Sequence, residues 1–401
     1  MLLATLAITA SLCIPTDVCC LPSERTVASL VVAAWQEAEQ SPAISPQHQR
    51  DLDADIELGR KYAAEVDKQV TLSTDEEMIE RVKRIGSELA AIANNHKVEV
   101  SWGDKRLNPF PYEFKVIESP DINAFALPGG VIYVHDALVK FCESDDELAG
   151  VLAHEISHSS FRHVAQWQRE SNKLTWTIPL ILAALVLGGR DGANAAMGIN
   201  LGQTAITSGW SQKAEQSADW GGIQYLVKSS YNPVGALTFM ERLAMKERAN
   251  PFLRDLGIFR THPPSRERAE MMIAHLQTLE IPIRRSEVTQ TYRVQLEPQE
   301  SGPVEVKFMD RILHTFGGAD AASRAQEAAK RLNEFFDSVP ELSDVTLRHG
   351  NVYAMRELLF EVTDDDAAVA GASREEVGAE TVRRMKRAMF MLGFRIWDIS
   401  G

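Results

Sequence analysis

The chain has 401 residues, of which 45% are hydrophobic and 24% charged, so it is long enough for two or three globular domains. Its formal net charge of −14 argues against a nucleic-acid partner, which would require a basic face, and against strong binding to an anionic membrane surface. The four cysteines (Cys13, Cys19, Cys20 and Cys142) form no CxxC pair and no disulfide framework, and Cys142 is interpreted as a packed thiol.

The first 46 residues are interpreted as a signal-like segment and the start of a linker. Two apolar runs, residues 1–12 and 27–35, lie in this segment, and the first resembles the hydrophobic region of an export signal although no basic residue precedes it. An ordinary N-terminal helix is the alternative. Residues 36–50 are polar and contain two prolines, which indicates a linker. The signal-like start predicts a protein of the cell envelope or periplasm, with a cytoplasmic location left open.

Helices and short strands are predicted from residue 47 onward. Apolar residues at helical spacing indicate two helices between Asp51 and Asn95, the second of them capped by Ser73–Glu76. Short strands are predicted over 98–102, 112–117 and 123–134, the last of which contains a Pro-Gly-Gly turn. Further helices are predicted over 211–225, 233–249 and 265–276.

The most informative feature is the pentapeptide His154-Glu155-Ile156-Ser157-His158, an HExxH motif inside a predicted helix. Residues four apart lie on one face of a helix, so both imidazoles can reach one metal ion. Glu155 projects beside them, where it can hold a water molecule at the metal without being a ligand. A metal in such a site lowers the pKa of its water from about 16 to near 7, which produces a nucleophile at neutral pH.

The surroundings of the motif favour a zinc site over the alternative, two surface histidines beside a glutamate. Apolar Leu148, Val151, Leu152 and Ile156 give the helix a buried side, so the histidines would lie at the edge of a core. Polar side chains in that position need a partner, and a metal ion provides one.

A run without charge follows the motif, from residue 174 to residue 187. It is too short to span a bilayer as a helix, which takes about 20 apolar residues, and it contains Pro179. A buried helix or a hydrophobic hairpin is predicted here. Association with a membrane surface through 174–187 is the alternative.

A zinc site needs at least three protein ligands, and HExxH supplies two. His163 and Glu215 are the candidates for the third. The metzincin pattern HExxHxxGxxH is not met, because Phe161 stands at its glycine position and Val164 at its last histidine position. Glu215 and Asp219 are four residues apart on a predicted helix and share one face. Glu215 could bind the metal and Asp219 could orient a histidine, whereas a solvated helix face is the alternative.

Residues 286–401 are predicted to form a separate domain. The predicted elements are a strand over 304–314, a helix over 321–336, strands over 345–348 and 352–362, a helix over 374–391 and a strand over 394–399. This alternation is typical of a small two-layer α/β domain. No group with catalytic chemistry is recognised in it, and its role stays open.

Four motifs resemble the HExxH peptidases grouped with the CAAX prenyl endopeptidase and the membrane protease HtpX, in the soluble branch found in bacterial envelopes. The motifs are Asn123–Val134, Asp146–His158, Glu215–Asp219 and Thr261–Arg266. They follow the family's order and cover roughly residues 50–280. The signal-like start and the C-terminal domain depart from the family pattern.

The resemblance implies a gluzincin metallopeptidase with a role for each motif. It implies that one zinc ion is held by His154, His158 and Glu215, with Glu155 as the general base. It further implies that the strand Asn123, Ala124 and Phe125 edges the substrate cleft, and that Asp219, His262 and Arg266 are auxiliary groups near the metal.

The expected fold is α+β. A mainly helical zinc metallopeptidase domain with a small edge-strand sheet is expected over residues 47–285, followed by the two-layer domain over 286–401. The expected function is a zinc-dependent endopeptidase acting on unfolded or misfolded envelope proteins, because an edge strand binds an extended peptide through its main chain. An envelope chaperone or binding factor with secondary protease activity is the alternative, and a zinc hydrolase of non-peptide bonds is a third interpretation. Protein or peptide substrates are the expected partners.

Overall fold

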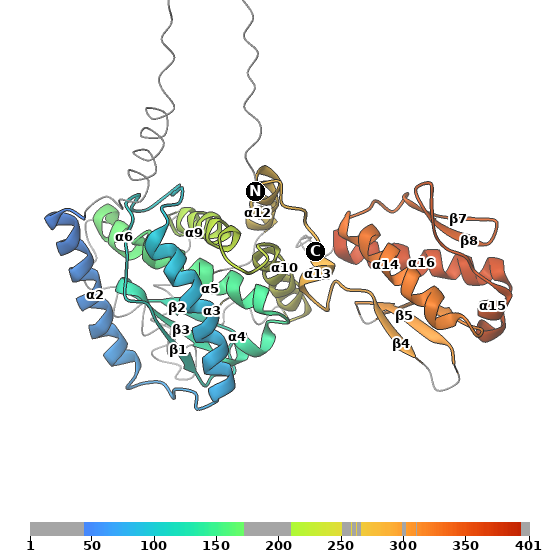
Figure 1. The fold of residues 1–401 in the computed structure, drawn as a ribbon, viewed down its shortest axis with the longest axis horizontal. Coiled ribbons are helices and arrows are strands. Elements are labelled where there is room, and N and C mark those ends of the chain that lie inside the picture. Colours follow the sequence, from blue (N-terminus) through green and yellow to red (C-terminus); the bar gives the residue numbers. More distant parts are fainter. Residues whose placement is uncertain are drawn as a thin grey trace, which may run out of the picture. The chain divides into compact units, whose positions relative to one another are not determined.

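The computed structural model describes residues 44–171, 210–250, 258, 262, 266–298, 302–309 and 311–393. The apolar runs near the N-terminus, the run 174–187 and the predicted strand 394–399 lie outside the described residues. Helices and small sheets make up the described chain, which is an α+β fold (Figure 1). No helix among these residues is both long enough and apolar enough to cross a membrane.

A small sheet lies at the centre of the first half of the chain. Its order is β1 (Glu113–Ile117), β3 (Val131–His135) and β2 (Ala124–Ala126), with β3 parallel to β1 and antiparallel to β2. Alternate residues of β3 point into two different hydrophobic clusters, so the strand is buried along its whole length. Helix α2 (Pro46–Val66) covers one face of the sheet, and the central helices cover the other.

Helix α5 (Asp145–Ser160) is the most deeply buried helix of this half. It packs against α3 (Glu76–Asn95), α9 (Trp210–Val227) and α10 (Val234–Ala249), and twelve of its sixteen residues are buried. Helix α3 begins after Asp75, whose side chain accepts a hydrogen bond from the Met78 backbone N–H. The remaining elements are η1 (Pro128–Gly130), α4 (Asp136–Phe141), α6 (His163–Ser171), α12 (Arg266–Thr278) and α13 (Arg285–Val288).

Two predictions for this half are wrong. Residues 98–102 form no strand, because the N–H and C=O of Glu99 bond the side-chain amide of Gln224 on α9 instead of a neighbouring strand. The second part of the predicted linker 36–50 is helical, since α2 already begins at Pro46. A proline fits the first turn of a helix, where its missing N–H would have no partner.

The second half has a hydrophobic core of its own, from Val294 to Met389. Two three-stranded antiparallel sheets contribute to it together with three helices. The first sheet consists of β4 (Gln295–Pro298), β5 (Val304–Phe308) and β6 (Arg311–Phe316), and the second of β7 (Val345–Arg348), β8 (Asn351–Ala354) and β9 (Glu357–Phe360). The helices are α14 (Ala321–Asp337), α15 (Asp364–Ala370) and α16 (Arg374–Gly393).

The predicted strands 304–314 and 352–362 are each a hairpin of two strands, and β4 was not predicted. The reversals occur at Met309 (φ 48°) and Met355 (φ 53°), both in the left-handed region. Tight hairpin turns are usually recognised from Gly, Asn or Asp at such positions, because other side chains rarely adopt a positive φ. Methionine carries no such signal, so the sequence suggested continuous strands.

Candidate metal centre

Helix α5 brings three residues of the HExxH motif to the site. Ser144 caps the helix by accepting a hydrogen bond from the Glu147 N–H, and three acidic residues in the first turn suit the positive end of the helix dipole. The last turns carry His154, Glu155 and His158, of which Glu155 is only 2% exposed. The apolar side of the helix is buried, so the histidines stand at the edge of the core as predicted.

Helix α9 supplies the carboxylates and approaches α5 closely. At Gly221 an added Cβ would lie 2.3 Å from the Phe161 ring and 2.8 Å from the Ser157 hydroxyl, so any larger residue would push the helices apart. This close approach places Glu215 and Asp219 opposite the histidines of α5. A glycine is needed here for space rather than for backbone conformation.

Donor atoms of four residues converge: among the described residues, His154, His158, Glu215 and His262 have ligand atoms within 4.8 Å of one another. The two Nε2 atoms of His154 and His158 are 3.0 Å apart, and Glu215 oxygens lie 3.3 and 3.4 Å from them. Tetrahedral ligands at zinc-nitrogen bond length are separated by about 3.3 Å. The donors are nitrogen and oxygen atoms of the kinds that zinc prefers, so the residues present fit this ion.

Burial and neighbouring charges shift the pKa values of these groups in opposite directions. Burial would raise the pKa of Glu215, but His262 and Arg268 hold it well below its ordinary value, so the carboxylate is ionised. Burial would lower the pKa of His154, but its hydrogen bonds to Asp219 and Glu215 raise it to about 10. Burial dominates at His158 and lowers its pKa. The centre thus places the Glu215 carboxylate beside the imidazole groups.

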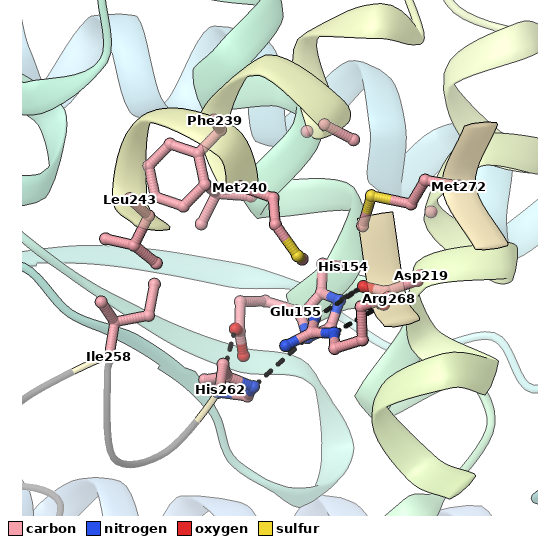
Figure 2. Close-up of a pocket in the computed structure, with 14 residues that line it drawn as sticks. His154, Glu155, Asp219, Phe239, Met240, Leu243, Ile258, His262, Arg268 and Met272 are labelled. Carbon is pink, nitrogen blue, oxygen red and sulfur yellow. Dashed lines mark hydrogen bonds and ion pairs between the residues drawn. The ribbon is translucent and has the colours of Figure 1, made fainter. Parts of the chain in front are cut away.

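Asp219 and Arg268 hold His154 in place. The Asp219 carboxylate lies 2.9 Å from Nδ1 of His154, which leaves Nε2 to face the centre. Arg268 donates two hydrogen bonds of 2.7 Å to Asp219 (Figure 2). It also lies 3.2 Å from Glu215. A carboxylate behind a ligating histidine fixes its tautomer and ring orientation.

Arg268 occupies the position expected for Arg266. Arg266 pairs with Glu270 one turn further along α12, and its side chain is 68% exposed. Arg268 is only 5% exposed. Both arginines stand near the start of the same helix, and no sequence signal distinguished them.

His163, the other candidate for the third ligand, does not belong to the converging group. Its Nδ1 lies 2.9 Å from Nδ1 of His158, on the side away from the centre. Burial and the nearby His158 hold the pKa of His163 well below its ordinary value, so this imidazole is neutral. This contact was not predicted from the sequence.

Two of the predicted substrate-binding residues, Ala124 and Phe125, lie on β2, an edge strand of the sheet, and Asn123 directly precedes it. Asn123, Ala124 and Phe125 are 1%, 0% and 2% exposed, and the Phe125 ring stacks on Tyr133 at 5.1 Å. The side chains of Ala124 and Phe125 belong to the two hydrophobic clusters on either side of the sheet. What this edge offers to a ligand is main-chain N–H and C=O groups.

An apolar pocket opens beside Glu155 and His262 (Figure 2). Its volume is about 40 Å³, and Figure 2 shows side chains of α10 and α12 around it. Nε2 of His262 lies 3.5 Å from the Glu155 carboxylate at the boundary between the pocket and the metal centre. The apolar lining consists mainly of Val151, Phe239, Met240, Leu243, Ile258 and Met272.

Comparison with known proteins assigns this part of the chain to a family. The model of peptidase family M48 matches residues 79–276, and a domain of unknown function, DUF8459, matches residues 311–390. The beta-barrel assembly-enhancing protease of Escherichia coli strain K12 is 31% identical over 213 residues, which are 52% of this chain and 41% of that protein. The mitochondrial metalloendopeptidase OMA1 of Schizosaccharomyces pombe is 31% identical over 162 residues, 40% of this chain and 46% of that protein. The metalloprotease LoiP of Escherichia coli strain K12 is 29% identical over 214 residues, 53% of this chain and 77% of that protein.

The chain spans less than half the length of the first two of these relatives. The stretch matched by the family model runs from within α3 to within α12 and contains all the residues of the metal centre. Through residues 79–276, the chain belongs to peptidase family M48.

Proposed function

We propose that this chain is a zinc-dependent endopeptidase that holds one zinc ion through His154, His158 and Glu215. The observation that carries the proposal is the separation of 3.0–3.4 Å between donor atoms of these residues, which suits tetrahedral ligands of one ion. The names of the relatives, a protease, a metalloendopeptidase and a metalloprotease, support the same chemistry.

Glu155 is proposed to move the proton. Bound zinc would polarise the scissile carbonyl and acidify the attacking water. Glu155 is buried next to the converging donors but is not among them, so it is free to accept the proton of the water and to return it to the leaving amine. His262 is proposed as an auxiliary group, because its two ring nitrogens contact Glu215 and Glu155.

The proposed substrates are extended segments of unfolded or misfolded proteins. The edge of β2 offers main-chain groups and hides its side chains, which favours binding of any extended peptide over a particular sequence. The pocket beside Glu155 is lined by apolar side chains, so we expect an apolar substrate residue next to the scissile bond.

The cell envelope is the proposed location. One relative is named for enhancing the assembly of β-barrels, and the N-terminal sequence has a signal-like apolar run. Mass spectrometry of the mature N-terminus in native cells tests this location. An N-terminus that begins at Met1 would contradict export by signal cleavage.

An envelope chaperone or binding factor is the second candidate function. Residues 311–390 match a domain of unknown function and lie outside the peptidase match, so they could recruit client proteins. A protein that only binds would have no use for a buried carboxylate at Glu155, which favours the enzyme.

The deciding experiment is cleavage of an unfolded protein such as casein by Glu155→Gln. Glutamine keeps the shape of the side chain but cannot accept the proton, and loss of a general base lowers rates by about 10²–10⁴-fold. We expect near-parent zinc content and melting temperature with activity lowered at least about a hundredfold. Glu270→Gln, an exposed change on α12, is the matched control and should cleave like the parent. Parent-like cleavage by Glu155→Gln would favour the binding factor.

Metal analysis tests the ligand set. Glu215→Ala removes the proposed third ligand and should sharply reduce the zinc content of the purified chain. Full zinc occupancy in this variant would overturn the assignment of Glu215.

A further inference from the structure

The end of α5 folds back onto one of the proposed zinc ligands. After the helix ends at Ser160, Arg162 adopts a left-handed backbone conformation (φ 53°), and His163 follows it at the start of α6. The ring of His163 faces that of His158 edge-on, with centroids 4.9 Å apart and ring planes at 82°. The two Nδ1 atoms are 2.9 Å apart, which is the length of a hydrogen bond.

The direction of this hydrogen bond follows from the other nitrogen of His163. Its Nε2 lies 3.0 Å from the backbone carbonyl oxygen of Trp102. A carbonyl can only accept, so Nε2 of His163 must carry the proton and Nδ1 of a neutral His163 must be the acceptor. His158 then donates from its own Nδ1 and keeps the lone pair on Nε2, the atom that faces the metal centre.

We propose that His163 is a positioning residue that fixes the tautomer and ring orientation of His158 for zinc binding. The proposal rests on the zinc site proposed above. Hydrogen bonding runs in one direction from His158 through His163 to the Trp102 carbonyl, and each link has a single arrangement of protons. We call these three groups the neutral relay.

The acceptor at the end of the neutral relay is itself held in place. The Ser217 hydroxyl on α9 donates to the Trp102 carbonyl at 2.8 Å and accepts from the Trp102 N–H at 3.1 Å. The neighbouring Gly103 has φ 122°, and an added Cβ would lie 2.7 Å from the Phe161 carbonyl oxygen and 3.0 Å from the His163 ring. This loop therefore presses against the turn that carries His163.

A buried ion cluster stabilises the turn from the other side. The Arg162 side chain is 4% exposed and donates to Asp55 of α2 at 2.6 Å and to Asp104 at 3.1 Å. A non-glycine residue adopts a positive φ only where its surroundings hold it there. The ion pairs of the Arg162 guanidinium thus stabilise the turn that directs His163 back toward His158.

The two proposed histidine ligands are therefore supported by different chemistry. His154 is backed by the Asp219 carboxylate, whereas His158 is backed by a neutral imidazole and a peptide carbonyl. A neutral support orients the ring without adding negative charge. Bound zinc would then receive no additional negative charge through His158, which would favour its action as a Lewis acid.

The test compares two substitutions of His163 in the full chain. Glutamine can accept from His158 through its oxygen and donate to Trp102 through its nitrogen, whereas leucine fills similar space with neither function. Zinc affinity is measured by chelator competition at one pH, with the melting temperature of each metal-free variant as the control for folding. We expect His163→Leu to weaken zinc binding about 10–100-fold, as is typical of outer groups that orient a ligand, and His163→Gln to stay within about threefold of the parent.

A third variant keeps the proposal testable if His163→Leu does not fold. Ser217→Ala loosens the Trp102 carbonyl two steps away from His158 and should weaken zinc binding by a smaller factor than His163→Leu. Parent-like affinity of His163→Leu or of Ser217→Ala, or equal loss in the leucine and glutamine variants, would overturn the relay. If Glu215→Ala loses zinc while His163→Leu does not, only the relay fails. If Glu215→Ala keeps zinc, the proposed zinc site fails.

Discussion

The Arg268 guanidinium contacts both carboxylates that line the metal centre. Arg268 is 5% exposed and contacts both Asp219 and Glu215, which are 5% and 6% exposed. Burial would raise the pKa of Asp219, and Arg268 outweighs burial and lowers it. Without Arg268, Asp219 and Glu215 would be buried close together with less positive charge beside them. The repulsion between the two carboxylates would destabilise the fold and disturb the orientation of His154.

Replacement of Arg268 tests this balance, and Arg266 offers a matched control two residues earlier. Arg268→Met should destabilise the chain by about 3–5 kcal/mol, the typical cost of leaving a buried charge without its partner. Arg266→Met removes an exposed pair and should stay within about 0.5 kcal/mol of the parent. Urea unfolding of both variants gives the comparison. Equal effects would show that Arg268 is not the compensating charge.

At the scale of single elements, helix α15 shows how a buried carboxylate can hold several segments together. Asp366 lies in the first turn, where it forms a capping box with Thr363. Its side chain is 0% exposed, accepts hydrogen bonds from Arg324 at 2.6 Å and from the Gly317 N–H at 2.8 Å, and lies 3.5 Å from His314. This one group links α15 with α14 and with the end of β6.

The same contacts make the second half of the chain sensitive to acid. Burial would raise the pKa of Asp366, but the nearby His314 ring and the hydrogen bonds from Arg324 and backbone N–H groups lower it well below the ordinary value. A depressed pKa contributes stability above the ordinary value of about 4, and this contribution is lost as the pH falls toward the folded-state pKa. Asp366→Asn should therefore be less stable than the parent at pH 7, by about 1–3 kcal/mol. The difference should shrink below about pH 4.

Urea unfolding at pH 7 and at pH 3.5 measures this difference. Asp364→Asn is the control, because Asp364 stands on the same helix with its side chain 92% exposed. A stability difference between parent and Asp366→Asn that does not change with pH would contradict the role of the ionised carboxylate.

At the scale of the whole molecule, the peptidase part extends past its last family motif. Helix α13 begins at Arg285, the last residue of the predicted peptidase domain, and Arg285 forms a buried ion pair with Glu241 of α10. Thr291 donates to Glu143 at 2.6 Å, and buried Tyr292 packs on Ala244. The core of the second half begins only at Val294. We therefore propose residue 293 as the end of the peptidase part, eight residues later than the sequence suggested.

Two shortened chains test this division. A chain that ends at Arg293 keeps these contacts and should bind zinc and cleave a short unstructured peptide. A chain that ends at Arg284 leaves Glu241 buried without its partner and should be less stable by about 3–5 kcal/mol. Zinc content, thermal unfolding and peptide cleavage are measured for both. If the longer chain folds and binds zinc but cannot cleave a peptide that the full chain cleaves, residues 294–401 contribute to the chemistry.

The sequence alone determined the features that depend on short spacing along one helix. A period of 3.6 residues places His154 and His158 on one face of their helix, whatever surrounds it. It likewise places Glu215 and Asp219 on one face of a second helix. The capping of α3 is local in the same sense, since the Asp75 side chain and the Met78 N–H that it accepts from are three residues apart. These predictions therefore required no knowledge of the fold.

Only the tertiary structure decided which nearby residues complete the centre. Arg266 and Arg268 are about 200° apart around the α12 axis, so the packing of α12 against α9 selects one and exposes the other. His163 reaches His158 because buried ion pairs hold Arg162 at a positive φ. In the second half of the chain, the hairpins turn at Met309 and Met355, which adopt a positive φ although neither is a glycine. These outcomes depend on contacts between residues far apart in the chain, and such contacts leave no mark in local spacing or composition.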